Sequence, residues 1–193
     1  METLELDQPR ITRHRLTAEQ YHRMGEAGVF EPDARVELIE GEVIDMAPIG
    51  TRHWSAVSRL TRLLVQATGE RAVISVQASI RLDEQSEPES DLAVLKPRDD
   101  FYASALPTGH DAWLVIEVAD TSAAYDLKLK SRLYALHGVP AYWVVDLAAG
   151  LLHTFAAPQG EAYTEAGATA SPGTLALPGL ADVALDLSEL FRL

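Results

Sequence analysis

The spacing of apolar and polar residues in the first third of the chain predicts a helix, a hairpin and a second helix. Residues 17–20 have the capping-box pattern of a helix start, and that helix is expected to end at residues 25–28. Alternating residues from 35 to 46 predict a hairpin that turns at Glu40-Gly41. A further helix is predicted over 53–68, because apolar residues recur there at helical spacing: Trp54, Val57, Leu60, Leu64 and Ala67.

The rest of the chain predicts a series of strands with one long helix between them. The expected strands cover residues 72–82, 91–95 and 112–118, followed by a hairpin of 142–146 with 151–155. A polar turn is expected at 83–90 and a loop at 99–111. The long helix is expected over 123–137, stopped by Gly138 and Pro140. Short strands and loops are expected over 157–180, and a short helix over Leu185 to Leu193.

The order of the central elements is therefore helix, strand, strand, strand, helix, strand. This order predicts an α/β or α+β fold, in which helices flank a mixed central sheet. The chain of 193 residues has no internal repeat and no long linker. We expect a single domain over residues 1–193, with a core at about 15–160 and a C-terminal extension.

Composition excludes several classes of protein. There is no cysteine, so disulfides and thiolate zinc sites are excluded. The acidic N-terminus lacks the basic and apolar regions of a signal peptide, and no apolar stretch approaches the roughly 18 residues that span a bilayer. We therefore expect a cytoplasmic protein with no membrane partner. The formal net charge of −13 argues against general attraction to nucleic acid, although a local basic patch remains possible.

Two acids lie where predicted strands are most apolar. Asp91 begins the run Asp91-Leu92-Ala93-Val94-Leu95, and Glu117 follows five apolar residues near the end of its strand. Carboxylates are rarely buried unless they are paired or bind metal, and strand ends are favoured ligand sites in α/β sheets. The pair predicts a site for Mg²⁺ or Mn²⁺, which prefer hard oxygen ligands. The alternative for Glu117 is a surface acid at a strand end.

The helix after Glu117 carries a lysine on its apolar side. At about 100° per residue, Lys130, Asp126 and His137 fall among the apolar residues, whereas Lys128 points to solvent. Asp126 is four residues before Lys130, so the two side chains are expected to meet. Lys130 is then either a snorkelling lysine paired with Asp126 or a cation directed at Asp91 and Glu117. The apolar half of this helix contains Leu127, Leu129, Leu133, Tyr134 and Leu136.

Three further polar residues are candidate site residues. His53 begins the second helix, where an anion is favoured, so it is either a phosphate contact or a capping and packing residue. Glu37 is either a further ligand or a solvated acid on a strand face. Gln77 lies in the middle of a strand and needs a hydrogen-bonding partner if it is buried.

Several motifs resemble one family of proteins. The runs 35–42, 91–94, 115–118, 126–130 and 138–146, together with His53, resemble the Uma-type "putative restriction endonuclease" family, also called domain of unknown function 820. The resemblance covers roughly residues 15–160, and the last two motifs are quite specific. This family is part of the PD-(D/E)XK nuclease superfamily, whose helix-strand-strand-strand-helix-strand core has the order described above.

The resemblance implies a role for each main candidate. Asp91 resembles the superfamily's first metal-binding aspartate, and Glu117 resembles its second acid. Ala119 stands where the usual lysine follows that acid, and Lys130 on the next helix resembles the lysine that has migrated in this family. Ser90 replaces the usual proline.

The sequence as a whole predicts a Mg²⁺-dependent endonuclease that hydrolyses DNA. Asp91 and Glu117 hold the metal, Lys130 assists the nucleophile or the transition state, and Asp126 fixes Lys130. A homodimer is expected, because paired sites suit duplex cleavage. The alternative, favoured by the net charge, is an inactive module of the same fold that binds a protein partner or a nucleic-acid end. The predicted phosphate contacts are Arg52, Arg59, Arg62 and Arg81.

Overall fold

A computed structural model describes residues 12–192 of the chain. The N-terminal residues on which the predicted absence of a signal peptide depends lie outside the described residues. Within residues 12–192, no helix is long and apolar enough to cross a membrane.

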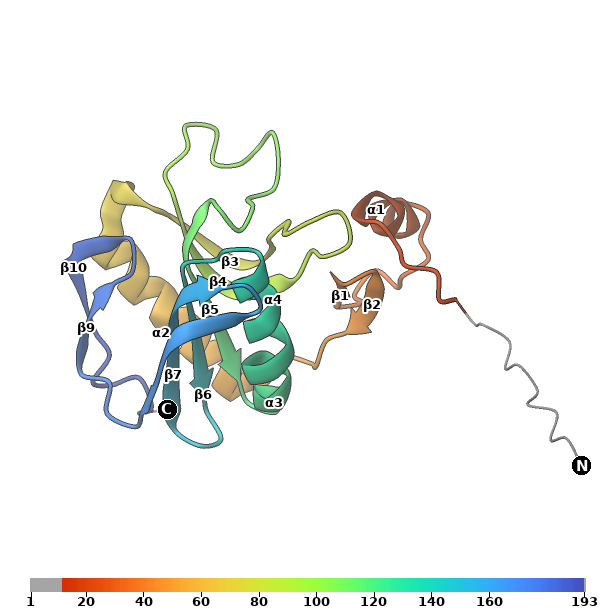
Figure 1. Cartoon of the computed structure of the whole chain (residues 1–193). Helices are drawn as coiled ribbons and strands as arrows, with labels where there is room; N and C mark the ends of the chain where they lie inside the picture. Colours follow the sequence, from red (N-terminus) through yellow and green to blue (C-terminus); the bar gives the residue numbers. More distant parts are fainter. Residues whose placement is uncertain (1–11, 193) are drawn as a thin grey trace, which may run out of the picture.

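A six-stranded sheet forms the centre of the molecule, with its strands in the order β3-β4-β5-β6-β7-β8 (Figure 1). Every neighbouring pair is antiparallel except β5 and β6, which are parallel. The predicted mixed sheet is therefore confirmed. The strands are β3 (Val73–Ser79), β4 (Glu89–Leu95), β5 (Ala112–Ala119), β6 (Ala141–Asp146), β7 (Leu151–Gln159) and β8 (Ala162–Thr169).

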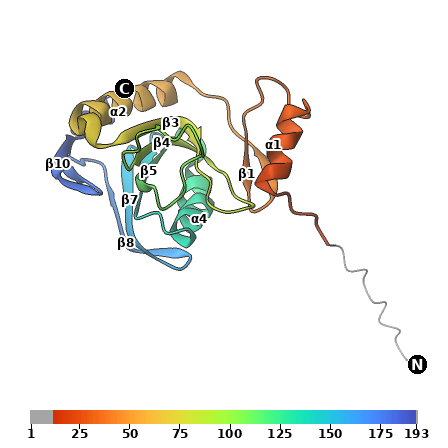
Figure 2. The ribbon, with the colours of Figure 1, turned by 90° about the horizontal axis from the view of Figure 1, so that it is seen from above.

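The two faces of the sheet are covered by different elements (Figure 2). Helix α2 (Thr51–Thr68) and the hairpin of β9 (Thr174–Leu177) and β10 (Leu180–Asp186) cover one face. Alternate residues such as Leu92 and Ile116 point to that face. The residues between them, such as Ala93 and Val115, point to the other face and pack against the helix that follows β5.

The crossover between β5 and β6 is a helix in three parts: α3 (Ala123–Tyr125), the π-turn η2 (Asp126–Lys130) and α4 (Ser131–Leu136). Parallel strands require such a crossover. Gly138, with φ of +70°, ends it as predicted. A π-turn adds a residue to one turn, so the apolar face is shifted beyond Lys130. Ala135 is consequently buried and Leu136 is 44% exposed, against the predicted pattern.

The N-terminal part forms a small arm beside the sheet (Figures 1 and 2), made of α1 (Ala18–Glu26), β1 (Val36–Ile39) and β2 (Glu42–Asp45). The predicted capping box of α1 is present. The predicted turn is also present, and Glu40 and Gly41 have φ values of +48° and +76°. Leu38 on β1 bridges to Glu87, which ties the arm to the segment before β4.

Two predictions about apolar residues are wrong. The short helix expected over Leu185–Leu193 is instead the end of β10 followed by a turn, in which the Leu190 amide donates to the Leu187 carbonyl. Leu193 lies outside the described residues. Trp54 is 64% exposed, although its spacing included it in the apolar stripe of α2. At about 100° per residue it lies at the edge of that stripe, beyond the reach of the sheet.

Candidate active site

The two candidate metal-binding acids occupy neighbouring positions on β4 and β5. The register pairs Leu92 with Ile116, and Asp91 and Glu117 are the next residues along the two strands. They therefore share the sheet face that carries the crossover helix. Asp91 is 8% exposed and Glu117 is 3% exposed. Like charges at adjacent cross-strand positions destabilise a sheet, so packing does not explain this pair.

Each acid is held by specific hydrogen bonds. Asp91 Oδ2 accepts from the Val118 amide at 2.9 Å, and Asp91 Oδ1 lies 3.0 Å from His53 Nε2. Glu117 Oε2 accepts from the Asp91 amide at 3.3 Å, and Glu117 Oε1 accepts from the Tyr134 hydroxyl at 3.1 Å. These contacts fix both carboxylates at the carboxyl end of β5.

Lys130 points into this cluster and is only 3% exposed. Its ammonium donates to the Glu89 carbonyl at 2.9 Å and lies 3.1 Å from both Glu37 and Glu117. The three donors of a lysine are thereby occupied. The snorkelling alternative is wrong, because the charged end is buried rather than in solvent. Lys128, two residues earlier, is exposed as predicted.

Asp126 does not fix Lys130 as expected. Its side chain accepts from the Ser122 hydroxyl at 2.6 Å. Among the described residues, the ion-pair partners of Lys130 are Glu37 and Glu117, because they and the Glu89 carbonyl occupy its three donors. Asp126 is buried nearby and acts on Lys130 through its charge alone.

Glu37 comes from the arm and completes the surroundings of Lys130. It is 2% exposed on β1, so the alternative of a solvated strand-face acid is wrong. Its Oε2 accepts from the Glu89 amide at 3.1 Å, and its Oε1 accepts from the Tyr125 hydroxyl at 3.0 Å. The arm therefore supplies part of the site.

The other two candidate polar residues have different positions. His53, in the first turn of α2, faces Asp91, and its buried Nδ1 has no hydrogen-bond partner among the described residues. Gln77 is partly exposed on the edge strand β3, with φ of +46°. Gln77 does not line the cavity that holds Asp91.

Of the four predicted phosphate contacts, Arg52 comes nearest to the site. It lies 3.1 Å from Asp120, which lines the cavity, and donates to the Leu147 carbonyl at 2.8 Å. All four arginines are outside the lining of the cavity. Arg59 donates to the Arg192 carbonyl, Arg81 pairs with Glu87, and Arg62 is exposed.

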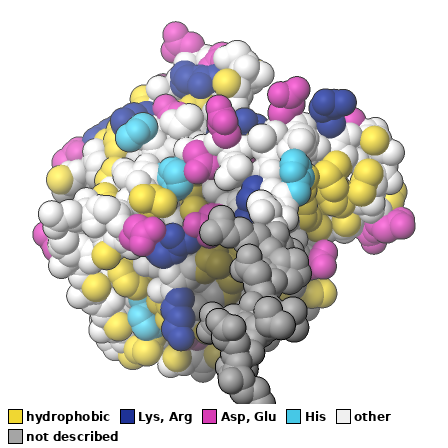
Figure 3. All heavy atoms as spheres, turned by 45° about the vertical axis from the view of Figure 1, so that its right-hand side comes forward, with side chains coloured by type: hydrophobic (Ala, Val, Ile, Leu, Met, Phe, Trp, Pro, Cys, Tyr) yellow, Lys and Arg dark blue, Asp and Glu magenta, His cyan; other side chains and the backbone are white. Residues whose placement is uncertain are grey.

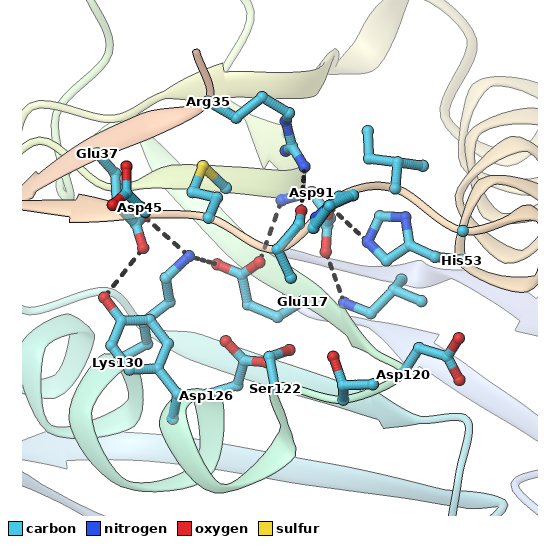
Figure 4. Close-up of a pocket in the computed structure, with 18 of the residues that line it drawn as sticks. Arg35, Glu37, Asp45, His53, Asp91, Glu117, Asp120, Ser122, Asp126 and Lys130 are labelled. Atoms are coloured by element: carbon cyan, nitrogen blue, oxygen red, sulfur yellow. Dashed lines mark hydrogen bonds and ion pairs between the residues drawn. The ribbon is translucent and has the colours of Figure 1, made fainter.

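These side chains surround a cavity of about 360 Å³ between the sheet end, the crossover helix and the arm (Figure 4). In the close-up, Glu37 and Lys130 approach Glu117 from one side, and His53 approaches Asp91 from the other. Arg35 also lines the cavity and lies 2.7 Å from Glu89. The apolar part of the wall consists of Ile44, Met46, Ala47, Pro48, Ile49 and Val118.

The cavity holds an excess of buried negative charge. Among its described lining residues, four buried carboxylates face one buried ammonium, that of Lys130. Burial raises the pKa of Glu117 well above its usual range; Lys130 opposes this shift, and Asp91 adds to it. Burial would lower the pKa of Lys130, but Glu117, Glu37 and Asp126 raise it, and the net direction is upward. Lys130 is therefore charged, and it cannot neutralise every acid.

The donor chemistry fits a divalent cation. Asp91 and Glu117 offer hard oxygens, and a cation would balance the charge that Lys130 leaves uncompensated. Within the described residues, no three histidine, aspartate or glutamate side chains already stand at metal-ligand spacing. Glu117 is engaged with Lys130, and Asp91 with His53. Asp91 and Glu117 are the residues that would hold the cation.

Sequence reasoning missed Arg35, Tyr125 and Tyr134. Tyr134 follows Lys130 by four residues, so helical spacing alone was a signal for it. Tyr125 donates to Glu37, 88 residues away in sequence, and Arg35 belongs to the arm, so their approach depends on tertiary structure.

Comparisons with known proteins agree with this architecture. A crystal structure described as that of "a putative nuclease belonging to DUF820", from Anabaena variabilis, matches with a TM-score of 0.70 and 16% sequence identity. The match covers 92% of this chain and 98% of that one, and it shows a shared fold. Among curated proteins, none matches this chain. The profile of the Uma2 family, described as "Putative restriction endonuclease", matches residues 18–188. The chain belongs to the Uma2 family of nuclease-like proteins, as the sequence motifs predicted.

Proposed function

We propose that this protein is a Mg²⁺-dependent endonuclease of the PD-(D/E)XK type that hydrolyses phosphodiester bonds in DNA. One observation carries the proposal: Asp91 and Glu117 lie side by side, buried, in a cavity with an excess of negative charge. Restriction-endonuclease-like families generally use divalent metals, which supports a metal at these acids. Mn²⁺ has similar preferences and would substitute.

A divalent cation held here would supply Lewis-acid chemistry, polarising a phosphate and lowering the pKa of a water molecule. Asp91 and Glu117 would hold the cation, and His53 orients Asp91 through their contact of 3.0 Å. The carboxylates of Glu117, Glu37 and Asp126 raise the pKa of Lys130, which favours a charged ammonium over a general base. Its role is electrostatic: the ammonium orients Glu117 and stabilises negative charge that develops on the phosphate.

A cleavage assay across nucleic-acid forms tests this function. We expect purified protein with Mg²⁺ or Mn²⁺ to cut supercoiled plasmid, linear duplex or single-stranded DNA, and EDTA to stop it. Asp91→Asn should lose cleavage by at least about 100-fold while keeping its melting temperature. Absence of cleavage with every DNA and RNA form and both metals would contradict the proposal.

That negative result would favour the alternative of an inactive module. The net charge of −13 supports the alternative, because it opposes contact with a polyanion. Sedimentation in the same buffers tests the proposed homodimer, which would bring two sites to one duplex.

A further inference from the structure

Trp54 is an unusual surface residue for this chain. Its side chain is 64% exposed, whereas Trp143 is 4% exposed and Trp113 packs against the β9–β10 hairpin. A tryptophan in water leaves a large apolar surface unburied, and tryptophans are enriched where a partner covers them. The ring of Trp54 is therefore available to a bound partner.

Trp54 directly follows His53, which lines the cavity. Its amide donates to the Gly50 carbonyl at 3.0 Å, so Trp54 lies one helical turn beyond Gly50, which lines the cavity. Its chain neighbour His53 reaches Asp91. Ile49, which also lines the cavity, is 38% exposed and extends the apolar surface at this end of α2.

Helix geometry places Trp54 on one flank of the site. Successive residues of α2 turn by about 100°, so Arg52 and Trp54 lie on opposite flanks of His53. A phosphate beside Asp91 and His53 would have a guanidinium on one flank and an indole ring on the other. This arrangement matches a nucleotide, which joins an anionic phosphate to a flat aromatic base.

We propose that Trp54 is a stacking platform for an unpaired nucleobase next to the phosphate in the cavity. This inference rests on the proposed function and specifies its substrate class. A base inside a duplex is already stacked on both faces, so an exposed ring engages a base that is single-stranded or splayed out at an end. The preferred substrate is therefore DNA with unpaired nucleotides beside the cleaved bond.

The test measures binding of a fluorescent single-stranded oligonucleotide and of a blunt duplex of the same sequence, in EDTA to prevent cleavage. Trp54→Ala should weaken single-strand binding by about 5- to 100-fold, the range for loss of one base–aromatic stack, and should change duplex binding less. Trp54→Phe should restore most of the affinity. Val65→Ala, which alters another exposed apolar residue of α2, is the matched control and should bind like the wild type.

Intrinsic fluorescence supplies a second readout. Single-stranded DNA should quench the wild-type emission, and Trp54→Phe should lose that quenching because the remaining tryptophans are packed in the protein. Unchanged single-strand affinity in Trp54→Ala would overturn the inference, even if the enzyme still cleaves DNA. A shift of Trp54→Ala to a smaller assembly with unchanged DNA affinity would also overturn it, and would assign Trp54 to a protein interface. Failure of the wild type to bind or cut any nucleic acid would instead overturn the proposed function.

Discussion

Three buried carboxylates of the site have a cationic or imidazole partner, and these pairings determine the role of each residue. The ammonium touches Glu37 and Glu117 at 3.1 Å, and the second carboxylate of the strand pair, Asp91, is directed to His53. Burying an isolated charge is very unfavourable. Removal of one partner would therefore leave an uncompensated buried charge and destabilise the protein. Truncations here should therefore lower stability as well as activity, whereas isosteric changes such as Asp91→Asn separate the two effects.

Lys130 should be essential for cleavage, whereas Lys128 should not. We expect Lys130→Met to lose at least about 100-fold in rate, because the electrostatic contribution of the ammonium is removed while its volume is kept. Lys128→Met, two residues away on the exposed side of the same helix, should keep most of the activity. Cleavage rates of both variants, with circular dichroism to verify folding, check this. An equal loss in the two variants would contradict the assigned orientation of the helix.

Glu117 should make the metal-free protein less stable as pH rises. Its pKa is higher in the folded protein than in the unfolded chain, so the folded state binds more protons between those two values. The free energy of unfolding therefore falls with rising pH in that window, which begins near the usual glutamate pKa of about 4.3. Glu117→Gln cannot ionise at this position, so the variant lacks this loss of stability with rising pH.

The measurement is denaturant unfolding of both proteins in EDTA at several pH values. The unfolding free energy of Glu117→Gln minus that of the wild type should increase as pH rises. A difference that stays constant from acid to neutral pH would show that Glu117 ionises in the folded protein as it does in the unfolded chain.

At the scale of elements, much of the arrangement follows from local pattern. The strand and helix order, the α1 capping box and the Glu40-Gly41 turn depend on neighbouring residues, and all three predictions are confirmed. The π-turn η2 was not predicted, because helical spacing assumes a constant number of residues per turn. The terminal strand was mistaken for a helix, since Leu185 and Leu190 gain their partners only by packing on α2 and the sheet.

The site, too, is predictable from the sequence only where it does not depend on contacts between distant segments. Asp91, Glu117 and Lys130 were found because charges in apolar patterns are conspicuous in sequence. The pairing of Lys130 with Glu37 was not found, because it joins the arm to the crossover helix. No local spacing reports a contact between elements so distant in the chain.

The β9–β10 hairpin should depend on a glycine at its turn. Gly179 has φ of +83°, and a Cβ there would overlap the ring of Trp113 on β5. Gly160 has φ of +59° but open space around it. Gly160→Ala should cost about 1 kcal/mol for its backbone conformation. Gly179→Ala should cost about 1–3 kcal/mol more than Gly160→Ala, because its Cβ overpacks the ring of Trp113.

Thermal or denaturant unfolding of both variants distinguishes the two contributions. Equal destabilisation would mean that the hairpin moves freely away from Trp113. The hairpin would then be a loosely attached element rather than part of the core.

At the scale of the whole molecule, acidity is the main obstacle to DNA binding. The net charge is −13, and acidic and basic side chains are interspersed on the face shown in Figure 3. DNA binding by the proposed endonuclease would therefore depend on a few local contacts rather than on a broad positive field. Arg52, whose side chain is 54% exposed beside Asp120, is the best placed of the predicted arginines.

Salt titration tests this view. DNA affinity should fall with salt, and Arg52→Ala should weaken binding while reducing the slope of log affinity against log salt by about one. Arg71→Ala is the matched control, because Arg71 pairs with Asp182 and lies just beyond the other end of α2. Equal slopes for Arg52→Ala and the wild type would remove Arg52 from the binding surface.

The contribution of Glu37 by the arm has a consequence for protein hybrids. Residues 47–50 connect the arm to α2 and contain no helix or strand, so they are a natural junction for exchanging segments between family members. A chimera joined there would inherit every strand of the central sheet from one parent. Its buried lysine would nevertheless meet an acid from the other parent, and the two halves would have to be compatible there as well as at the bridge between Leu38 and Glu87. Exchange of segments at this junction is therefore constrained by a charge match between two residues that are far apart in the chain.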